Sequence, residues 1–310
     1  MTYETVIHYK KNFRDYKKYA FNDLKYGFNE EEKNKNLSRF KNQIKSKKIY
    51  DKLPTIPDFL EVNIQNLIKT SIPNSFGIEV KIKLTSPYYS SDDDDFYIVQ
   101  NPCLKEKVFK VPMVRGNGWK GALLDSAREI INKEQNNTQK IEYLKSYFRV
   151  FGVGDDIFRK VVEKIDDNSL KLFFMLSGLA INVNSDIKKI FEQYKERKAQ
   201  KGRAIFYPTY FEKLSLELIN PHNRKTKAGT NPIHYEVVPK ESRAELKIVY
   251  IPFDGINQKN DDIKKEAKQD LEFLAKCIKK VSQNGIGAKT KLGWGRFEMD
   301  GEIDSFWSER

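Results

Sequence analysis

Cysteine is scarce in this chain of 310 residues, and its two cysteines lie far apart. Cys103 and Cys277 have neither CxxC nor CxxH spacing, which argues against a structural zinc site and fits a reducing compartment. No apolar run reaches ~18 residues, the length a membrane span needs. The first residues, MTYETVIHYKKNF, contain no hydrophobic signal-peptide core. We therefore expect a cytoplasmic protein without a membrane-spanning segment.

The sequence also lacks a complete P-loop. The segment GIGAKT, residues 285–290, has Ala288 where that motif needs the glycine before Lys-Thr. A P-loop must also follow a strand and open a helix, whereas here a helical run precedes the segment and a strand follows it. We therefore expect no nucleotide cofactor.

Positive charge is in clear surplus. Lysine and arginine total 56 against 43 acidic residues, which gives a net charge of +13 and a pI near 9.3. Such a field attracts polyanions before any specific contact forms, although a lysine-rich composition alone would produce the same surplus. Aromatic residues make up 13% of the chain and serve either as core or as stacking platforms for bases. The composition therefore agrees with a nucleic-acid partner.

Two glycine-rich basic segments are the strongest local signals. The first, QNGIGAKTKLGWGRFEM at residues 283–299, has glycines that let the main chain approach a ligand closely. The second, VPMVRGNGWKGALLDSAREI at residues 111–130, leads into an amphipathic helix whose unpaired N-terminal amides favour an anion. Together they predict a surface that binds RNA phosphates and bases.

Periodicity gives the order of the elements. Residues 1–75 read as a charged helical extension, and strict alternation begins in FGIEVKIKL at residues 76–84, the first expected strand. A helix follows at about 118–133, then a helical insertion at about 155–201 and a second long helix at about 260–283. The remaining strands are expected in GRAIFYPTYF, LSLELIN, YEVVP, AELKIVYIPFD and GRFEM.

Without the insertion, the order is strand, helix, strand, strand, helix, strand. This order predicts an α+β fold with a ferredoxin-like or RRM-like βαββαβ core over residues 76–300, followed by a tail at residues 301–310. The side chains predicted to be buried in its core are Phe76, Ile78, Val80, Ile82, Ile205, Phe206, Val237, Ile248, Val249 and Phe273.

Five motifs stand in order between residues 76 and 300: PMVRGNGWKGALLDSAR, VFG, GRAIFYPTYF, INPHNRKTKAGTNPIHYEVVP and GIGAKTKLGWGRFEM. Together they resemble the RAMP superfamily of CRISPR-associated proteins. The resemblance implies a subunit of a type III effector complex, either the repeating backbone subunit or the subunit that caps the backbone. Its partners would be guide RNA, target RNA and other CRISPR effector subunits. The basic loop at about 220–234 would be a thumb that interrupts guide–target pairing, with an ordinary solvated hairpin as the alternative.

Catalysis is a further implication of the resemblance. In the repeating backbone subunit, an aspartate after the first strand supports metal-dependent cleavage of target RNA. The matching residues here would hold Mg²⁺ or another divalent ion through carboxylate oxygens; they are Asp92, Asp93, Asp94 and Asp95. A solvated, mutually repelling acidic loop is the alternative.

Histidine offers a different chemistry. Guide-RNA-processing endoribonucleases of the same superfamily use histidine as a general acid or base without a metal. His222 and His234 flank the basic loop and could serve such a role, or they contact RNA or pack.

A non-enzymatic RNA-binding subunit needs only basic loops, aromatic side chains and a sheet. Tryptophan beside glycine either stacks on a base or packs the loop onto the core. The residues predicted to contact RNA are Arg115, Trp119, Lys120, His222, Arg224, Lys225, Lys227, Lys289, Lys291, Trp294 and Arg296.

Overall fold

A five-stranded antiparallel sheet organises the chain in this computed structural model, which describes residues 61–92, 101–196, 198–221, 225, 229, 232–256 and 258–308. Strand β1, Phe76–Leu84, pairs along most of its length with β9, Arg243–Tyr250. Strand β5, Ala204–Phe206, pairs with the other edge of β9, and β10, Phe297–Met299, pairs with the other edge of β1. Numbered in chain order, these four strands are arranged 4-1-3-2 across the sheet.

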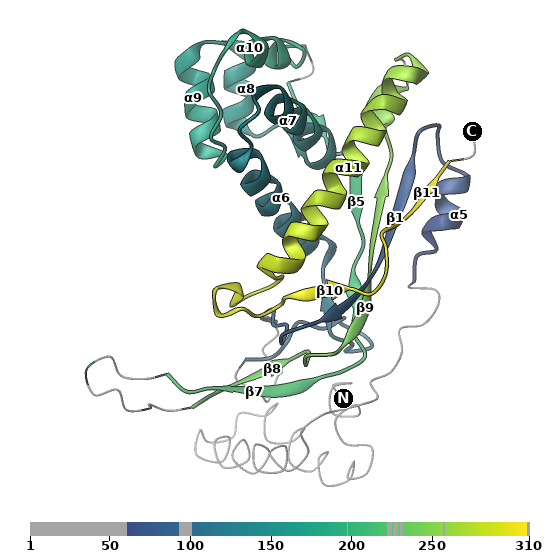
Figure 1. Ribbon diagram of the computed structural model, residues 1–310, viewed down its shortest axis with the longest axis vertical. Helices are drawn as coiled ribbons and strands as arrows, with labels where there is room; N and C mark the ends of the chain where they lie inside the picture. Colours follow the sequence, from purple (N-terminus) through teal and green to yellow (C-terminus); the bar gives the residue numbers. More distant parts are fainter. Residues whose placement is uncertain are drawn as a thin grey trace, which may run out of the picture.

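Two long helices cover one face of this sheet (Figure 1), α6 at Gly116–Lys133 and α11 at Asn260–Asn284. The alternating residues of β1 point to that face and are fully buried: Phe76, Ile78, Val80, Ile82 and Leu84. Helix α6 buries one residue per turn against them: Trp119, Leu123, Ala127 and Ile131. The strand period of two and the helix period of 3.6 thus meet in one core. The predicted α+β class is confirmed.

Most of the predicted core residues are buried, and the prediction fails at β5. Those confirmed are Phe76, Ile78, Val80, Ile82, Val237, Ile248, Val249 and Phe273. Ile205 is 41% exposed, and Phe206 is only half-buried. Ile205 lies opposite Val249 in the register, on the face where the six-residue helix α5, Ile64–Lys69, packs on Val249. That helix covers the central strand and leaves the edge strand open to solvent.

Residues 155–201 contain helices, as their sequence predicts. Helix α7, Asn137–Phe151, leads into them and ends at Gly152, whose φ of 81° closes the helix. The two-residue strands β3, Gly152–Val153, and β4, Gln200–Lys201, pair at the base of this helical region. Three short helices pack on α7 through phenylalanines: α8 at Asp156–Glu163, α9 at Asp167–Leu176 and α10 at Ser185–Glu192.

A buried network of charged groups joins this helical region to the sheet. Arg149 of α7 makes a two-pronged contact with Asp270 of α11, with N–O distances of 2.6 and 2.9 Å. Tyr250 of β9 donates its hydroxyl to Asp270 at 2.6 Å and accepts from Arg203 at 3.0 Å. Because every one of these groups is buried and paired, the network fixes one arrangement of helix and sheet.

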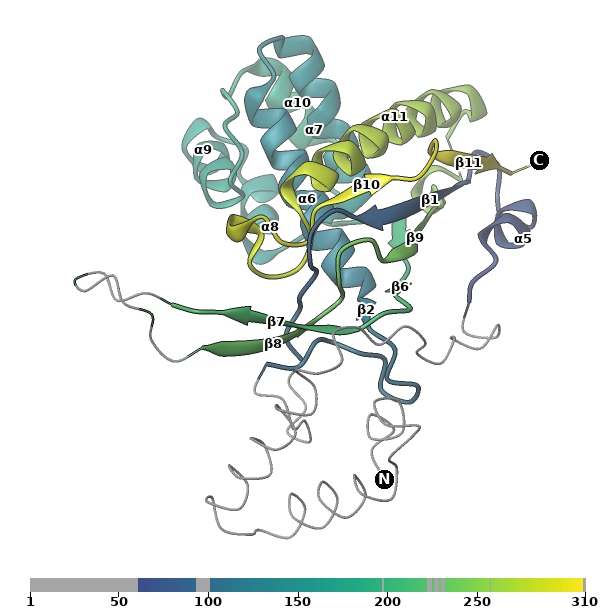
Figure 2. The same ribbon diagram turned by 60° about the horizontal axis from the view of Figure 1, so that its bottom comes forward.

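A second ladder extends from the sheet as a hairpin, formed by β7, Ser215–Ile219, and β8, Ile233–Val237. The hairpin projects away from the helix-covered sheet (Figure 2). Beside its root, β2, Met113–Val114, pairs with β6, Thr209–Tyr210.

The C-terminal residues differ from the predicted tail. Residues Asp304–Trp307 form β11, which pairs with β1 beyond the end of β10. Trp307 packs on Phe76 with ring centroids 5.2 Å apart. This contact, together with Phe306 packing on the α5 cluster, holds a segment whose polar composition conceals the strand. Of the predicted extension, residues 1–60 lie outside the described residues. No helix in the described ranges is both long and apolar enough to cross a membrane.

Candidate nucleic-acid interface

The loop between α11 and β10, residues 285–296, is closed by its glycines. A Cβ at Gly295, where φ is 73°, would collide with the carbonyl oxygen of Ile286, and one at Gly287 would collide with that of Tyr89. The close approach allows the amide of Gly295 to donate to Pro87 at 2.7 Å and that of Ala288 to donate to Tyr89 at 2.7 Å. The glycines therefore hold the loop against the segment after β1, and its charged side chains form the outer surface.

Three predicted cations of this loop lie in two environments. The side chains of Lys291 and Arg296 are exposed. Lys289 has a left-handed backbone (φ 64°), and its ammonium group lies 4.4 Å from the centroid of the Tyr235 ring on β8. A phosphate can reach the first two directly, whereas Lys289 already has an aromatic partner.

Trp294 belongs to an aromatic cluster that sequence reasoning missed. Tyr235 lies edge-on to Trp294 with centroids 5.9 Å apart, and Tyr89 lies edge-on to Tyr235 at 5.1 Å. Trp294 is half-buried there, and Tyr89 is 5% exposed. The three rings come from segments far apart in the sequence, so no local pattern could predict that they meet. The sequence showed only that each aromatic residue lies beside a polar loop. The cluster joins the glycine-rich loop to the hairpin.

The other glycine-rich segment begins helix α6. Arg115 is its N-cap residue, no side chain caps the first turn, and a Cβ at Gly116 would collide with the carbonyl of Phe206. Residues 116–121 have GxGxxG spacing, but the strand before them, β2, pairs antiparallel and not in a parallel βαβ unit. Arg115 and Lys120 are exposed beside the first-turn amides. This turn therefore presents the cations and helix dipole that favour a phosphate.

Trp119 does not offer a face to a base, and its predicted stacking role is wrong. It is fully buried, donates its indole N–H to Thr209 Oγ1 at 2.8 Å and packs edge-on against Phe297 with centroids 5.8 Å apart. Of the two roles considered for a tryptophan beside glycine, Trp119 has the second, because it packs the loop onto the core. Since Lys120 follows Trp119 and Arg296 precedes Phe297, this buried contact joins the two glycine-rich segments through the core.

Only part of the acidic loop and the predicted thumb is described. The amide of Asp92 donates to Pro102 at 3.2 Å, and its carboxylate accepts from the amide of Lys105 at 3.4 Å. Lys225 is exposed in a turn, and His234 is half-buried on β8. The other predicted residues lie outside the described residues: Asp93, Asp94, Asp95, His222, Arg224 and Lys227.

The described residues do not by themselves form a metal site. Among them, no three Asp, Glu, His or Cys side chains gather as ligands. Asp92 supplies one carboxylate, whereas Mg²⁺ is usually bound by one or two carboxylates together with waters and phosphate oxygens. The predicted site at residues 92–95 therefore stays a prediction.

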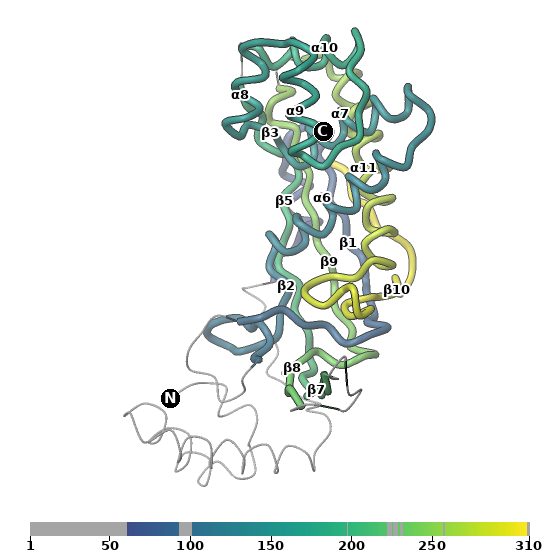
Figure 3. The backbone as a smooth tube through the Cα atoms, turned by 90° about the vertical axis from the view of Figure 1, so that its left-hand side faces the viewer, coloured from purple at the N-terminus to yellow at the C-terminus, as the bar shows by residue number. Residues whose placement is uncertain are grey.

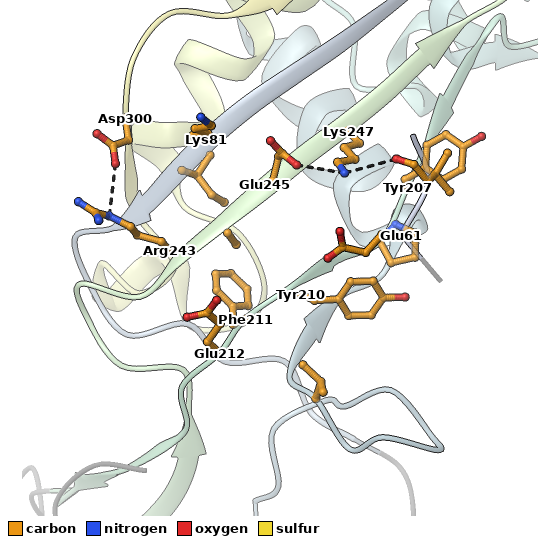
Figure 4. Close-up of a pocket in the computed structure, with 15 residues that line it drawn as sticks. Glu61, Lys81, Tyr207, Tyr210, Phe211, Glu212, Arg243, Glu245, Lys247 and Asp300 are labelled. Atoms are coloured by element: carbon orange, nitrogen blue, oxygen red, sulfur yellow. Dashed lines mark hydrogen bonds and ion pairs between the residues drawn. The ribbon is translucent and has the colours of Figure 1, made fainter. Parts of the chain in front are cut away.

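A groove of about 360 Å³ lies on the sheet face that α6 and α11 leave open (Figure 4). Two of the three cations that line it have acidic partners: Arg243 Nε lies 3.3 Å from Asp300, and Lys247 Nζ lies 3.0 Å from Glu245. Four carboxylates line it: Glu61, Glu212, Glu245 and Asp300. Because carboxylates outnumber cations there, the groove suits RNA phosphates less well than the glycine-rich segments do.

Comparisons with known proteins place these features in context. A family model, that of the RAMP superfamily, matches residues 81–298, from the middle of β1 into β10. No curated protein matches the chain. The chain is similar to one in a cryo-EM structure of type III-B Cmr-beta bound to cognate target RNA, with 13% identity, a TM-score of 0.47, and coverage of 99% of this chain and 89% of that chain. It is also similar to crystalline Cmr6 from Pyrococcus furiosus, with 17% identity, a TM-score of 0.34, and coverage of 73% and 98%.

Proposed function

The chain belongs to the RAMP superfamily, and on that premise we propose that it is a guide-RNA-binding subunit of a type III CRISPR effector complex. It holds the guide backbone and helps to present target RNA. Its partners are guide RNA, target RNA and other effector subunits. The 4-1-3-2 strand order with two helices on one face supports a ferredoxin-like core for this subunit.

One observation carries the proposal. Lys291 and Arg296 are exposed on the loop that leads into Phe297, and Phe297 packs on Trp119 in the first turn of α6, where Arg115 and Lys120 are also exposed. Cations around uncapped amides neutralise phosphate charge without reading sequence. Such a surface suits a subunit that must accept any guide, and affinity should come chiefly from the RNA backbone.

Crosslinking tests where RNA lies. The full chain is bound to single-stranded RNA that contains 4-thiouridine, irradiated, digested and analysed by mass spectrometry. We expect crosslinked peptides from residues 285–296 and 115–121 and from β8. Crosslinks confined to residues 155–201, or to the groove in Figure 4, would contradict the assignment of the surface.

Metal-dependent cleavage is a separable part of the proposal, and its support is the family resemblance of residues 92–95. The test compares target-RNA cleavage by the assembled, guide-loaded complex in Mg²⁺ and in EDTA, with Asp92, Asp93, Asp94 and Asp95 intact or all changed to alanine. Loss of Mg²⁺-dependent cuts with RNA binding intact makes the subunit a ribonuclease; unchanged cuts leave it an RNA-holding subunit.

The alternative of a guide-processing endoribonuclease needs a histidine that acts as acid or base. His234 is half-buried on β8, near the end of the ladder that leads into the loop, and its carbonyl accepts from Asn101 at 2.9 Å. Guide processing that continues in EDTA and stops in His234→Ala or His222→Ala would favour that alternative.

A further inference from the structure

A buried ion pair lies at the root of the β7–β8 hairpin. Lys105 Nζ contacts the carboxylate of Glu236 on β8, and the two side chains are 1% and 3% exposed. The same carboxylate oxygen accepts the amide of Cys103 at 3.1 Å. Burial raises the pKa of the Cys103 thiol to about 12, in spite of the nearby lysine, which is consistent with a site that excludes water.

The segment that carries Lys105, residues 101–105, is hydrogen-bonded to the hairpin on one side. The amide of Glu236 donates to Asn101 O at 2.9 Å, and Asn101 Nδ2 donates to His234 O at 2.9 Å. The carboxylate contacts with Cys103 and Lys105 complete this side. The position of β8 therefore depends on residues 101–105.

On its other side, the same segment is bonded to the entry of the acidic loop. The amide of Leu104 donates to Ser90 O at 2.8 Å, that of Asp92 to Pro102 O at 3.2 Å, and that of Lys105 to the Asp92 carboxylate at 3.4 Å. Two of these contacts hold Asp92, the first aspartate of the loop, and the third holds Ser90 just before it. The ion pair lies where the hairpin and the acidic loop are joined.

A small rotation at this root would produce a larger displacement at the far end of the hairpin. Strand β7 has five residues, and at about 3.3 Å per residue it is about 16 Å long. A tilt of about 10° at the root would move its far end by about 3 Å, which is close to the spacing of successive stacked bases, ~3.4 Å. A well-packed apolar pair would often be as stable as a buried ion pair. A charged pair with defined partners instead specifies a single geometry.

We infer that Lys105 and Glu236 are positioning residues that fix the β7–β8 hairpin against the entry of the acidic loop, so that both elements meet a defined step of the guide–target RNA. The inference rests on the proposed function. The pair itself does not contact RNA. It sets the angle of the hairpin, and the hairpin contacts the RNA.

The test uses the assembled, guide-loaded complex with 2-aminopurine placed at successive positions of the target RNA. With the wild-type chain, we expect bright fluorescence at the nucleotides where the hairpin interrupts pairing. The Lys105→Met, Glu236→Leu double variant removes both charges and should lose at least half of that enhancement, or shift it by a nucleotide, while RNA affinity changes by less than about twofold. Lys105→Arg keeps the pair and should retain the wild-type pattern.

Two outcomes would overturn the inference: an unchanged pattern in the double variant, or an equal loss in the double variant and in Lys105→Arg. If the double variant fails to fold by circular dichroism, Glu236→Gln is judged by the same criteria, because its amide oxygen still accepts from Cys103 and Lys105 while the charge is gone. A wild-type complex that binds no RNA overturns the proposed function, and this inference with it. Retained RNA binding with an unchanged pattern overturns the inference alone.

Discussion

At the scale of single residues, the cations of the glycine-rich loop are not equivalent. Lys289 lies over Tyr235 at 4.4 Å, a contact worth roughly 0.5–1 kcal/mol at a partly exposed site. A phosphate that recruits Lys289 must compete with this ring. Lys291 and Arg296 are exposed and carry no such cost, so they should contribute more to RNA affinity than Lys289 does.

The glycines of the loop give a sharp residue-scale prediction. Gly295→Ala places a methyl group against the Ile286 carbonyl at a positive φ and should destabilise the fold by about 2 kcal/mol or more. Gly121→Ala is the control, because a Cβ at this exposed position in α6 meets nothing within 4 Å. It should stabilise the helix by about 0.5–1 kcal/mol. Urea denaturation measures both, and an equal effect of the two variants would refute the packed loop.

The two cysteines give a second prediction at this scale. Burial raises the pKa of both thiols, that of Cys103 to about 12 from an ordinary 9.0. At pH 8 about one Cys103 thiol in ten thousand is then ionised, and the thiolate is the reactive form. The native chain should therefore react with Ellman's reagent far more slowly than the chain in 6 M guanidinium does. Rapid release of two equivalents of thionitrobenzoate from the native protein would show that both thiols are accessible to the reagent.

At the scale of elements, α6 and α11 are clamped together at their surface as well as through the core. Glu129 of α6 lies 3.0 Å from Lys280 of α11 and accepts from Asn284 at 2.9 Å. Its other partner, Lys133, lies 2.6 Å away within α6. The clamp sits where α11 ends and the glycine-rich loop begins, so it connects helix packing to the position of the loop.

This clamp predicts a pH dependence. Hydrogen bonds from Lys133, Asn284 and Lys280 lower the pKa of Glu129 to about 2, from an ordinary 4.5. A lowered folded-state pKa stabilises the fold above the unfolded value and loses that contribution as the pH falls toward the folded value. Glu129→Gln should cost less than about 1 kcal/mol at pH 7, because the group is partly exposed and screened. The difference should shrink between pH 4.5 and 2. A difference in urea stability that is constant over this range would contradict the clamp.

An element could be predicted from the sequence where the residues that determine it lie close together in the chain. The alternation of β1 and the periodicity of α11 are local patterns, and both elements were predicted within a few residues. The exposure of Ile205 depends on the length of α5, and β11 depends on Trp307 meeting Phe76 far away in the chain. Likewise, the burial of Trp119 depends on Thr209 and Phe297. Single-sequence periodicity carries no information on such long-range partners.

At the scale of the whole molecule, the described elements occupy different positions along its length. The helical insertion lies at one end, the hairpin at the other, and the glycine-rich loop between them, as Figures 1 and 3 both show. The net charge of +13 attracts RNA in general. We assign the direct phosphate contacts to the glycine-rich segments, whereas RNA binding through overall charge would not depend on where the cations lie.

The salt dependence of RNA binding separates these two cases. One variant changes Lys120, Lys289, Lys291 and Arg296 to alanine. The matched control removes the same charge from exposed lysines of the insertion and of the distant end of α11: Lys160, Lys171, Lys195 and Lys264. Affinity for single-stranded RNA is measured by fluorescence anisotropy over a range of salt concentrations, with the full-length chain throughout.

Each phosphate contact contributes about 0.7 to the slope of log affinity against log salt concentration for single strands. We expect the first variant to lose a slope of up to about 3 and to bind every sequence more weakly, while the control keeps a slope close to that of the wild type. Equal losses in the two variants, or no loss in the first, would contradict the claim that the two glycine-rich segments form the RNA-binding surface.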